Sequence, residues 1–446
     1  MRKVLIVTHE FPGMGGSRLL KFAQHLPRLG YEPVILTVKA GKTNGAAGPH
    51  HDIKVFRTPC VRKSPFRVFS KLFGSWSTTV YFESLFFIPD LYITWLPSAL
   101  IKGYHLIKEE NIDVILTSSP PESLHLIGLL LKKLTGVKWI ADFQDLWTTK
   151  KIVYRPPTHI HDLIVKRLER TIYAGCDHLI ANTMGNKRFY RELFGIDEKR
   201  VTVIPCGYDT NEEALNHSRP HIKRPSDTFI LGYMGYFDKD GFPWQEFLLS
   251  FKDLIDSRRI DGIEFRICGH MSHQARRFIE KNDLSGHVRH YGVLPHEKAY
   301  KLISESDLLV LLLYETSYSK AIVPHKLYYY LAMSKPVLAL VEEGGEVEDI
   351  MRRTGAGKTV SATKPDAVRQ ALNEYYDQWK ERGQISYSAD REIVAGYEYG
   401  NLTRTLKEAM DKVLGIDVEI FRVKNEQGSG RKNDKPYLYL HREHQV

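Results

Sequence analysis

The sequence predicts an α/β protein built from two doubly wound domains that face each other across a cleft. Three observations support this fold class. Short apolar runs alternate with segments of helical periodicity, the alternation stops in a polar stretch over residues 209–227, and it then begins again. The chain has 446 residues, which is enough for two or three domains that each bury a core.

The first half contains short apolar runs of the kind found in buried parallel strands. They cover residues 4–8, 34–38, 114–117, 137–141, 178–181 and 201–204. A helix is predicted between the runs at 137–141 and 178–181. Apolar residues recur there at spacings of three or four, namely Ile160, Leu163, Ile164, Leu168 and Ile172. Residues 1–208 are therefore predicted to form the first domain.

The polar stretch 209–227 has no apolar period and contains several Asn, Ser and Pro residues, which predicts a linker. A second domain over residues 228–389 is predicted from further strand-like runs at 229–234, 264–268, 308–313 and 336–341. Because open α/β sheets bind ligands beyond the carboxyl ends of their strands, two such domains define a cleft between them.

Beyond the second domain, residues 390–415 carry one more helical pattern. The tail over residues 416–446 has mixed charges and a Gly-Ser-Gly run, which predicts weak order.

Composition narrows the class of protein. Hydrophobic residues make up 43% of the chain and charged residues 26%, which excludes a disordered chain and a polytopic membrane protein. Lys and Arg number 63 against 53 for Asp and Glu, so the net charge is +10. This excess favours an anionic partner, and nucleic acid, anionic lipid and a nucleotide all remain open.

The sequence predicts neither a metal-binding cysteine cluster nor a targeting or membrane-spanning segment. Cys60, Cys176, Cys206 and Cys268 are far apart and form no metal-binding spacing, so reduced thiols are expected. The N-terminus lacks the apolar core of a secretory signal, and no stretch reaches the roughly 20 apolar residues that span a bilayer. A cytoplasmic protein that meets a membrane from one side is expected.

The loop after the first predicted strand, residues 12–17, carries Gly13, Gly15 and Gly16 where a helix begins. Glycines there let backbone N–H groups approach an anion at the positive end of the helix. The loop lacks a complete phosphate-binding motif, so a tight turn that needs positive φ is an equal alternative.

A set of motifs runs through both halves of the chain. In the first half these are SSPP at 118–121, HLIG at 125–128, WIADFQDLW at 139–147, CDHLIAN at 176–182 and VTVIPCGYD at 201–209. In the second half they are GYMG at 232–235, ICG at 267–269, GVLP at 292–295, HKL at 325–327 and PVLA at 336–339. In order and spacing, from residue 1 to about 415, they resemble the family 4 glycosyltransferases of the GT-B fold.

The resemblance implies transfer of a sugar from a nucleotide-sugar donor, held mainly by the second domain, to an acceptor bound mainly by the first. It also implies retention of anomeric configuration, no metal or other cofactor, and a C-terminal helix over 390–415 that crosses back to the first domain. The leaving group is a nucleoside diphosphate, so cations and helix N-termini must stabilise its developing charge.

The sequence departs from the family pattern at three places. Tyr236 stands where the family has an Arg, although Lys239 follows closely. Ala321 and Tyr329 stand at the two usual glutamates, and Gln144 replaces an Arg of close relatives. These departures leave open an alternative to the predicted glycosyltransferase, namely a binding or scaffold protein that keeps the GT-B fold without transfer activity.

Lys326, next to His325 at a predicted helix start, is the leading candidate to hold the donor diphosphate. Its alternative is a solvated lysine of an ordinary first helical turn, and Lys320 is a weaker candidate. The resemblance also assigns donor contacts to Tyr329, which can offer the ribose one hydrogen bond. The remaining donor-binding candidates are Gly15, Gly16, Gly235 and Lys239.

On the acceptor side, Asp142, Gln144 and Asp145 follow a strand at the ligand-binding edge, where a carboxylate could orient an acceptor hydroxyl. Helix capping or an internal salt bridge is the alternative. His125 lies in an apolar helical run and is predicted to be structural. The Asp238-Lys239-Asp240 run is predicted to be a surface turn and no metal site.

Residues 62–76 interleave cations with bulky apolar side chains, as an interfacial segment facing anionic lipid would. Core packing of these aromatics is the alternative. A glycan or lipid-linked acceptor, with peripheral contact on the inner face of the cell membrane, is therefore expected. A nucleic-acid partner is not expected, because no nucleic-acid-binding signature accompanies the spread charges.

Overall fold

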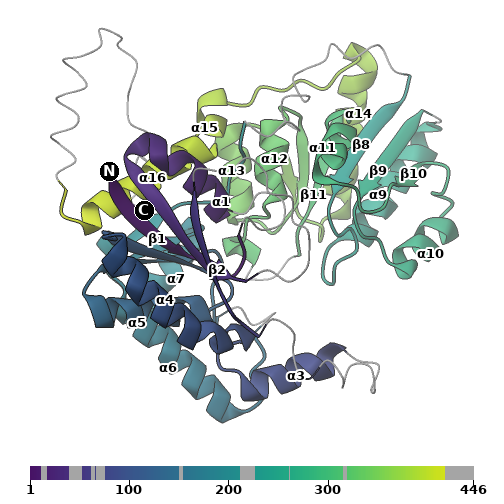
Figure 1. Cartoon of the computed structure of the whole chain (residues 1–446). Helices are drawn as coiled ribbons and strands as arrows, with labels where there is room; N and C mark the ends of the chain where they lie inside the picture. The colour runs from purple at the N-terminus through teal and green to yellow at the C-terminus, as the bar shows by residue number, and fades with distance from the viewer. Residues whose placement is uncertain are drawn as a thin grey trace, which may run out of the picture.

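The fold was analysed in a computed structural model that describes residues 1–11, 18–39, 53–61, 66, 76–149, 154–210, 227–260, 262–314 and 319–416. These residues form two lobes, each built around one parallel sheet (Figure 1). The architecture confirms the predicted fold class of two doubly wound α/β domains. The predicted glycine loop at 12–17, most of the linker and the tail lie outside the described residues.

The first sheet has seven strands in the order β3-β2-β1-β4-β5-β6-β7, all paired in parallel. Its strands are β1 Arg2–Val7, β2 Tyr31–Val38, β3 Lys54–Thr58, β4 Val114–Ser119, β5 Lys138–Phe143, β6 His178–Ala181 and β7 Val201–Val203. The predicted apolar runs are confirmed as strands, and β3 is additional. It escaped the prediction because this edge strand, KVFRT, is only partly buried and alternates charge with apolar residues.

Helices cover both faces of the first sheet. They are α1 Arg18–His25, η1 Leu26–Leu29, α3 Trp76–Phe86, η2 Leu91–Trp95, α4 Leu96–Glu109, α5 Ser123–Thr135, α6 His159–Gly175, α7 Met184–Phe194 and η3 Glu198–Arg200. The packing of α5 on β5 is close. A Cβ added at Gly128 would lie 2.4 Å from Nε1 of the buried Trp139, so only glycine fits there.

The predicted helix at 160–172 is confirmed as α6. Of its predicted apolar residues, Leu168 and Ile172 pack on the core, whereas Ile160 and Leu163 are 67% and 55% exposed. The N-terminal part of the predicted apolar face therefore points away from the core. The period identified the helix and could not show which of its apolar residues had a partner surface.

The second sheet has the order β10-β9-β8-β11-β12-β13, again all parallel. Its strands are β8 Phe229–Met234, β9 Ile263–Cys268, β10 Val288–His290, β11 Leu308–Leu312, β12 Val337–Leu340 and β13 Gly357–Val360. The predicted runs are confirmed as β8, β9, β11 and β12. The two edge strands were missed because VRH and GKTV are short, polar and partly exposed.

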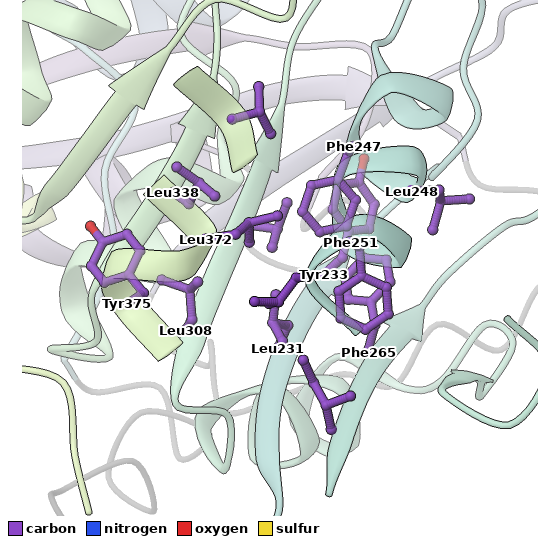
Figure 2. Packing of buried hydrophobic residues seen from close by; sticks show 14 of the residues in the cluster. Leu231, Tyr233, Phe247, Leu248, Phe251, Phe265, Leu308, Leu338, Leu372 and Tyr375 are labelled. Atoms are coloured by element: carbon purple, nitrogen blue, oxygen red, sulfur yellow. The ribbon is translucent and has the colours of Figure 1, made fainter. Parts of the chain in front are cut away.

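The helices of the second domain are α9 Trp244–Arg258, α10 His273–Lys281, α11 His296–Ser304, η4 Ser319–Ala321, α12 Lys326–Ala332, α13 Glu346–Thr354 and α14 Pro365–Arg382. Figure 2 shows the core on one face of this sheet, where Phe247 and Phe251 of α9 pack on Phe265 of β9. The ring centroids of Phe247 and Phe265 are 5.0 Å apart. On the same face, α14 contributes Leu372 and Tyr375.

The C-terminal pattern at 390–415 forms two helices, α15 Arg391–Ala395 and α16 Tyr399–Val413, so the single predicted helix was wrong. The two helices are separate because Gly396 caps the end of α15, and Glu398, which precedes α16, has an extended backbone. Helix α16 lies beside α1 in the first lobe (Figure 1), where its buried Tyr399 contacts Phe22 with ring centroids 5.8 Å apart. Helix α16 thus packs on the first domain.

Two stretches of chain connect the lobes, and they lie side by side. The Tyr208 amide donates to the Tyr397 carbonyl at 3.1 Å, and the Tyr399 amide donates to the Tyr208 carbonyl at 2.9 Å. We call residues 205–210 and 396–400 the double crossing. No helix within the described ranges is both long and apolar enough to span a bilayer.

Candidate active site

The candidate site lies at the junction of the two domains, where the described strands of each sheet end. The second domain contributes the loop after β8, Tyr314 after β11 and the first turn of α12. The first domain contributes the loop after β5 and the stretch that follows β7. These are the positions at which a doubly wound sheet presents its functional side chains.

Lys326, the first residue of α12, has an unusual environment. Its Nζ donates to the Tyr233 hydroxyl at 2.7 Å and lies 3.9 Å from the centroid of the Tyr233 ring. The Phe242 ring centroid is 5.9 Å away. In the part of the chain that the structure describes, no carboxylate lies within ion-pair distance of this ammonium. Among the described residues, this partly buried amine is therefore held by a tyrosine hydroxyl and by aromatic rings.

Burial, and after it the nearby charge of Lys239, lower the pKa of Lys326 to about 7. Desolvation disfavours the charged form of an amine that has no counter-ion, and a like charge acts in the same direction. An anion placed against Nζ would reverse both effects. The geometry therefore suits a group that binds a negatively charged ligand and is incompletely charged without it.

Gly235 follows β8 directly and adopts φ +120°, a conformation that favours glycine. A Cβ at this position would lie 3.3 Å from Lys326 Nζ, so the missing side chain leaves the ammonium accessible from the backbone side. The structure thus brings two predicted donor residues, Gly235 and Lys326, into contact.

Lys239 is exposed, and its Nζ lies 5.9 Å from the Phe242 ring centroid. It shares that ring with Lys326, so two lysines flank one aromatic side chain. Tyr236 is 51% exposed. The neighbouring Asp238 accepts a hydrogen bond from the Ser272 amide at 3.0 Å, which fits the predicted turn. Among the described residues, no group of three or more potential metal ligands is arranged to hold an ion.

His325 and Tyr329 occupy different positions from Lys326. The His325 Nε2–H donates to the Gly207 carbonyl at 3.2 Å, which connects α12 to the double crossing. Tyr329 is 1% exposed, and its ring centroid lies 4.7 Å from that of Tyr300 and 5.1 Å from that of His325. Both side chains pack at the junction, and a contact between Tyr329 and a donor ribose stays a prediction.

Asp142 at the end of β5 is fully buried in an ion pair with Arg18. Arg18 Nε and Nη2 donate to the two carboxylate oxygens at 3.1 and 3.2 Å, and the Ser118 hydroxyl donates at 2.7 Å. This is the internal salt bridge that the sequence left as the alternative. Since every carboxylate oxygen has a partner and none is exposed, the arrangement gives no support to catalysis by Asp142.

Arg18 was not identified from the sequence. Besides Asp142, it donates to the carbonyls of Ile204 and Pro205 at 2.6 and 2.5 Å. It therefore fixes the beginning of the double crossing against the end of β5. A buried arginine in an amphipathic helix gives no sequence signal of this kind, because its partners lie more than 120 residues away.

Gln144 and Asp145 follow Phe143 in the loop after β5. The Gln144 side-chain amide donates to the Ser118 hydroxyl at 3.0 Å, which attaches it to the buried ion pair. Asp145 is partly buried and faces the second domain: burial, and then the charge of Asp145, raises the pKa of Tyr314. The Tyr314 ring lies 5.9 Å from that of Phe242, so Asp145 approaches the Lys326 cluster across the junction.

The remaining predictions are placed as follows. Gly15 and Gly16 lie outside the described residues, as does most of the predicted interfacial segment 62–76. His125 is buried with Nδ1 2.8 Å from the Thr117 hydroxyl, and burial lowers its pKa to about 3, which agrees with the predicted structural role. Cys60, Cys176, Cys206 and Cys268 are free thiols.

Comparisons with known proteins agree with the motif evidence. The profile described as Glycosyltransferase Family 4 matches residues 15–212, and that described as Glycosyl transferases group 1 matches residues 218–392. A probable glycosyltransferase of Pseudomonas aeruginosa, WbjE, is 22% identical over 347 residues, which are 76% of this chain and 80% of that protein.

Solved structures show the same fold. A glycosyltransferase from Rickettsia africae ESF-5 superposes with a TM-score of 0.63 at 18% identity, over 93% of this chain and 98% of that one. Anabaena Alr3699/HepE, whose structure contains UDP and glucose, superposes with a TM-score of 0.60 at 12% identity, over 92% of this chain and all (100%) of that one.

Proposed function

We propose that this chain, which belongs to the family 4 glycosyltransferases, transfers a sugar from a nucleotide-sugar donor and holds the donor diphosphate with Lys326. The observation that carries this proposal is a partly buried ammonium with aromatic neighbours and a pKa near 7, at the first turn of α12. The donors of this family carry a diphosphate, and its negative charge beside Nζ would favour the fully charged form of Lys326.

The chemistry follows from where charge develops. As the glycosidic bond to the diphosphate breaks, negative charge grows on the leaving oxygens. Lys326, with Lys239 beside the same Phe242 ring, would stabilise that charge in a partly dehydrated site. On the family resemblance, we propose that transfer retains the anomeric configuration and uses no metal, so these lysines supply the positive charge.

Asp145 is the carboxylate that we propose to orient the acceptor hydroxyl. It follows β5 on the acceptor side of the junction, and its charge acts on Tyr314 of the second domain. Asp142 is its matched neighbour, since that carboxylate is occupied by Arg18 and Ser118. A substitution at Asp145 should therefore lower turnover with little loss of stability, unlike one at Asp142.

We propose a lipid-linked or other envelope glycan as the acceptor, with the enzyme bound peripherally to the inner face of the membrane. Support comes from exposed apolar side chains on α3 and the first turns of α6, which lie at the outer edge of the first domain (Figure 1): Tyr81, Phe86, Ile160, Leu163 and Ile164. His161 Nε2 lies 3.1 Å from the Leu85 carbonyl and joins the two helices. Exposed Lys166, Arg167 and Arg170 follow on α6 and suit an anionic surface.

The test of the proposed donor site is thermal unfolding with UDP, GDP, ADP, dTDP and CMP. A nucleotide at 100 times its Kd should stabilise the native protein by about 2.7 kcal/mol. The K326A variant should fold, lose this stabilisation and lose transfer, whereas the R155E variant, with an exposed charge changed elsewhere, should keep both. Stabilisation of K326A equal to that of the native chain would refute the role of Lys326.

The alternative, a GT-B scaffold without transfer activity, predicts a different result in the same experiment. It would show no stabilisation of the native chain by any nucleotide, with or without acceptor. The scaffold would also be favoured if the protein bound a nucleotide but neither hydrolysed nor transferred the sugar of any nucleotide sugar tested.

A further inference from the structure

A pocket lies away from the Lys326 site, between the first helix and the double crossing. It has a volume of about 260 Å³ and is lined by Lys21, Gln24, His25, Arg28 and Asp209. The neighbours of Lys326 are Tyr233, Phe242 and Lys239, and none of them lines this pocket. The proposed transfer reaction gives it no role.

The pocket is positively charged overall. Lys21 and Arg28 are cations, and Asp209 is the single carboxylate of the lining. Lys21 Nζ lies 3.2 Å from the Asp209 carboxylate, and both residues are buried. Arg28 is exposed, and among the described residues it has no ion-pair partner. One cation of the pocket therefore remains to be neutralised.

His25 gives the second, independent indication of a ligand. The residue is only 9% exposed, and its Nε2 has no hydrogen-bond partner within the described ranges. The nearest Asp209 oxygen is 3.7 Å away, which is beyond a hydrogen bond. A buried polar nitrogen without a partner is uncommon in native structures. Because His25 lines the pocket, its Nε2 is available to a ligand that enters it.

The position of these residues follows from one face of α1. Arg18, Lys21 and His25 follow one another at spacings of three and four, so they project to the same side. Arg18 holds the carbonyls of Ile204 and Pro205, and Lys21 holds Asp209. A Cβ added at Gly400 would lie 3.8 Å from the His25 ring, so the segment 396–400 of the double crossing also lies close to His25.

We propose that this pocket binds a small phosphate-bearing molecule at the double crossing. The Arg28 guanidinium and Lys21 ammonium match a phosphate in charge, and the Gln24 side chain and His25 Nε2 can form further hydrogen bonds to it. The volume accommodates a phosphate group with a small organic remainder. The bound phosphate and Asp209 would both contact Lys21. Phosphate binding would therefore affect the Lys21–Asp209 ion pair, and Asp209 lies in the segment that connects the two domains.

Calorimetric titration of the full chain with inorganic phosphate tests the site. The K326A variant should bind phosphate as the native chain does, because the pocket does not include Lys326. The R28E variant should bind about tenfold or more weakly. The R155E variant changes an equally exposed arginine outside the pocket and should bind like the native chain.

Two arms distinguish the source of the phosphate and the two sites. Tighter binding of glycerol 3-phosphate than of inorganic phosphate would identify an organic phosphate ester, and equal binding would identify the free anion. The R28E variant should bind UDP as tightly as the native chain does. A failure of the proposed donor site would therefore appear as lost UDP binding, and a failure of the phosphate pocket would not. Phosphate binding that is lost in K326A, unchanged in R28E, or undetectable up to about 10 mM would overturn the proposal.

Discussion

The pH dependence of nucleotide binding tests the Lys326 assignment directly. Without ligand, burial and Lys239 hold the pKa of Lys326 near 7, well below its ordinary value of 10.5. A diphosphate against Nζ favours the ammonium and raises this pKa. Binding must therefore be coupled to uptake of a proton whenever the pH lies between the free and the bound pKa.

The sign and size of the effect follow from this coupling. At pH 7 about half of the free lysine is charged, and each pH unit above 7 lowers the charged fraction by up to about tenfold. The affinity for a nucleoside diphosphate should therefore fall about tenfold between pH 7 and pH 8.5. Below about pH 6.5 the phosphate of the ligand begins to take up a proton itself, so the range above 7 is the informative one.

Isothermal titration calorimetry measures both quantities. Affinity is recorded from pH 7 to pH 9, and the binding enthalpy is compared at pH 8 in two buffers of different ionisation enthalpy, which reports proton uptake. The K326M variant keeps an unbranched side chain without the charge, and it should bind weakly and with no pH dependence in this range. An affinity that is flat in the native chain, or equally steep in K326M, would refute the reasoning.

Further predictions concern stability and membrane binding. D142N should lower the free energy of unfolding by about 3 kcal/mol in urea, because it leaves the Arg18 guanidinium buried without a counter-charge; unchanged stability with lost turnover would instead indicate a catalytic Asp142. G128A should cost about 1–3 kcal/mol in the same assay, since its Cβ would overlap Trp139, and an unaltered midpoint would contradict that close packing. L163E should weaken sedimentation with vesicles containing anionic lipid while leaving transfer to a soluble acceptor unchanged, and equal sedimentation would exclude this face of α6.

The sequence was sufficient to predict the central strands and not the sheet edges. Strands β1, β4, β8 and β11 are buried on both faces, so they read as continuous apolar runs. The edge strand β3 has exposed positions and charged residues, and its pattern resembles that of a loop. Burial on both faces is what makes a parallel strand visible in sequence.

The residues of the candidate site also differ in whether the sequence could identify them. Lys326 could be found because the motif and the helix start are local features of the sequence. The partnership of Arg18 with Asp142 could not, because the two residues are 124 positions apart and only the sheet brings them together. The exposed apolar face of α6 was misassigned for a related reason: periodicity shows that a helix has an apolar side and does not show whether another element covers it.

Position 321 illustrates how a missing family residue can reflect a change in packing. The family resemblance predicts a glutamate where this chain has Ala321, and the structure places Ala321 against the first domain. The Thr183 hydroxyl donates to its carbonyl at 2.9 Å, and a Cβ added at Gly185 would lie 2.8 Å from its Cβ. A longer side chain at this junction has no room.

The junction already holds a carboxylate of its own. Glu346 accepts a hydrogen bond from the Gly185 amide at 2.5 Å, and burial raises its pKa. Restoring the family residue with A321E should therefore place a second acid beside Glu346 and separate the domains, at a cost of about 1–3 kcal/mol in urea unfolding. A321Q, of equal size and without charge, separates the steric part of this cost from the electrostatic part. If A321E instead kept full stability and tightened nucleotide binding, position 321 would be a lost donor contact and the junction would have to open to admit it.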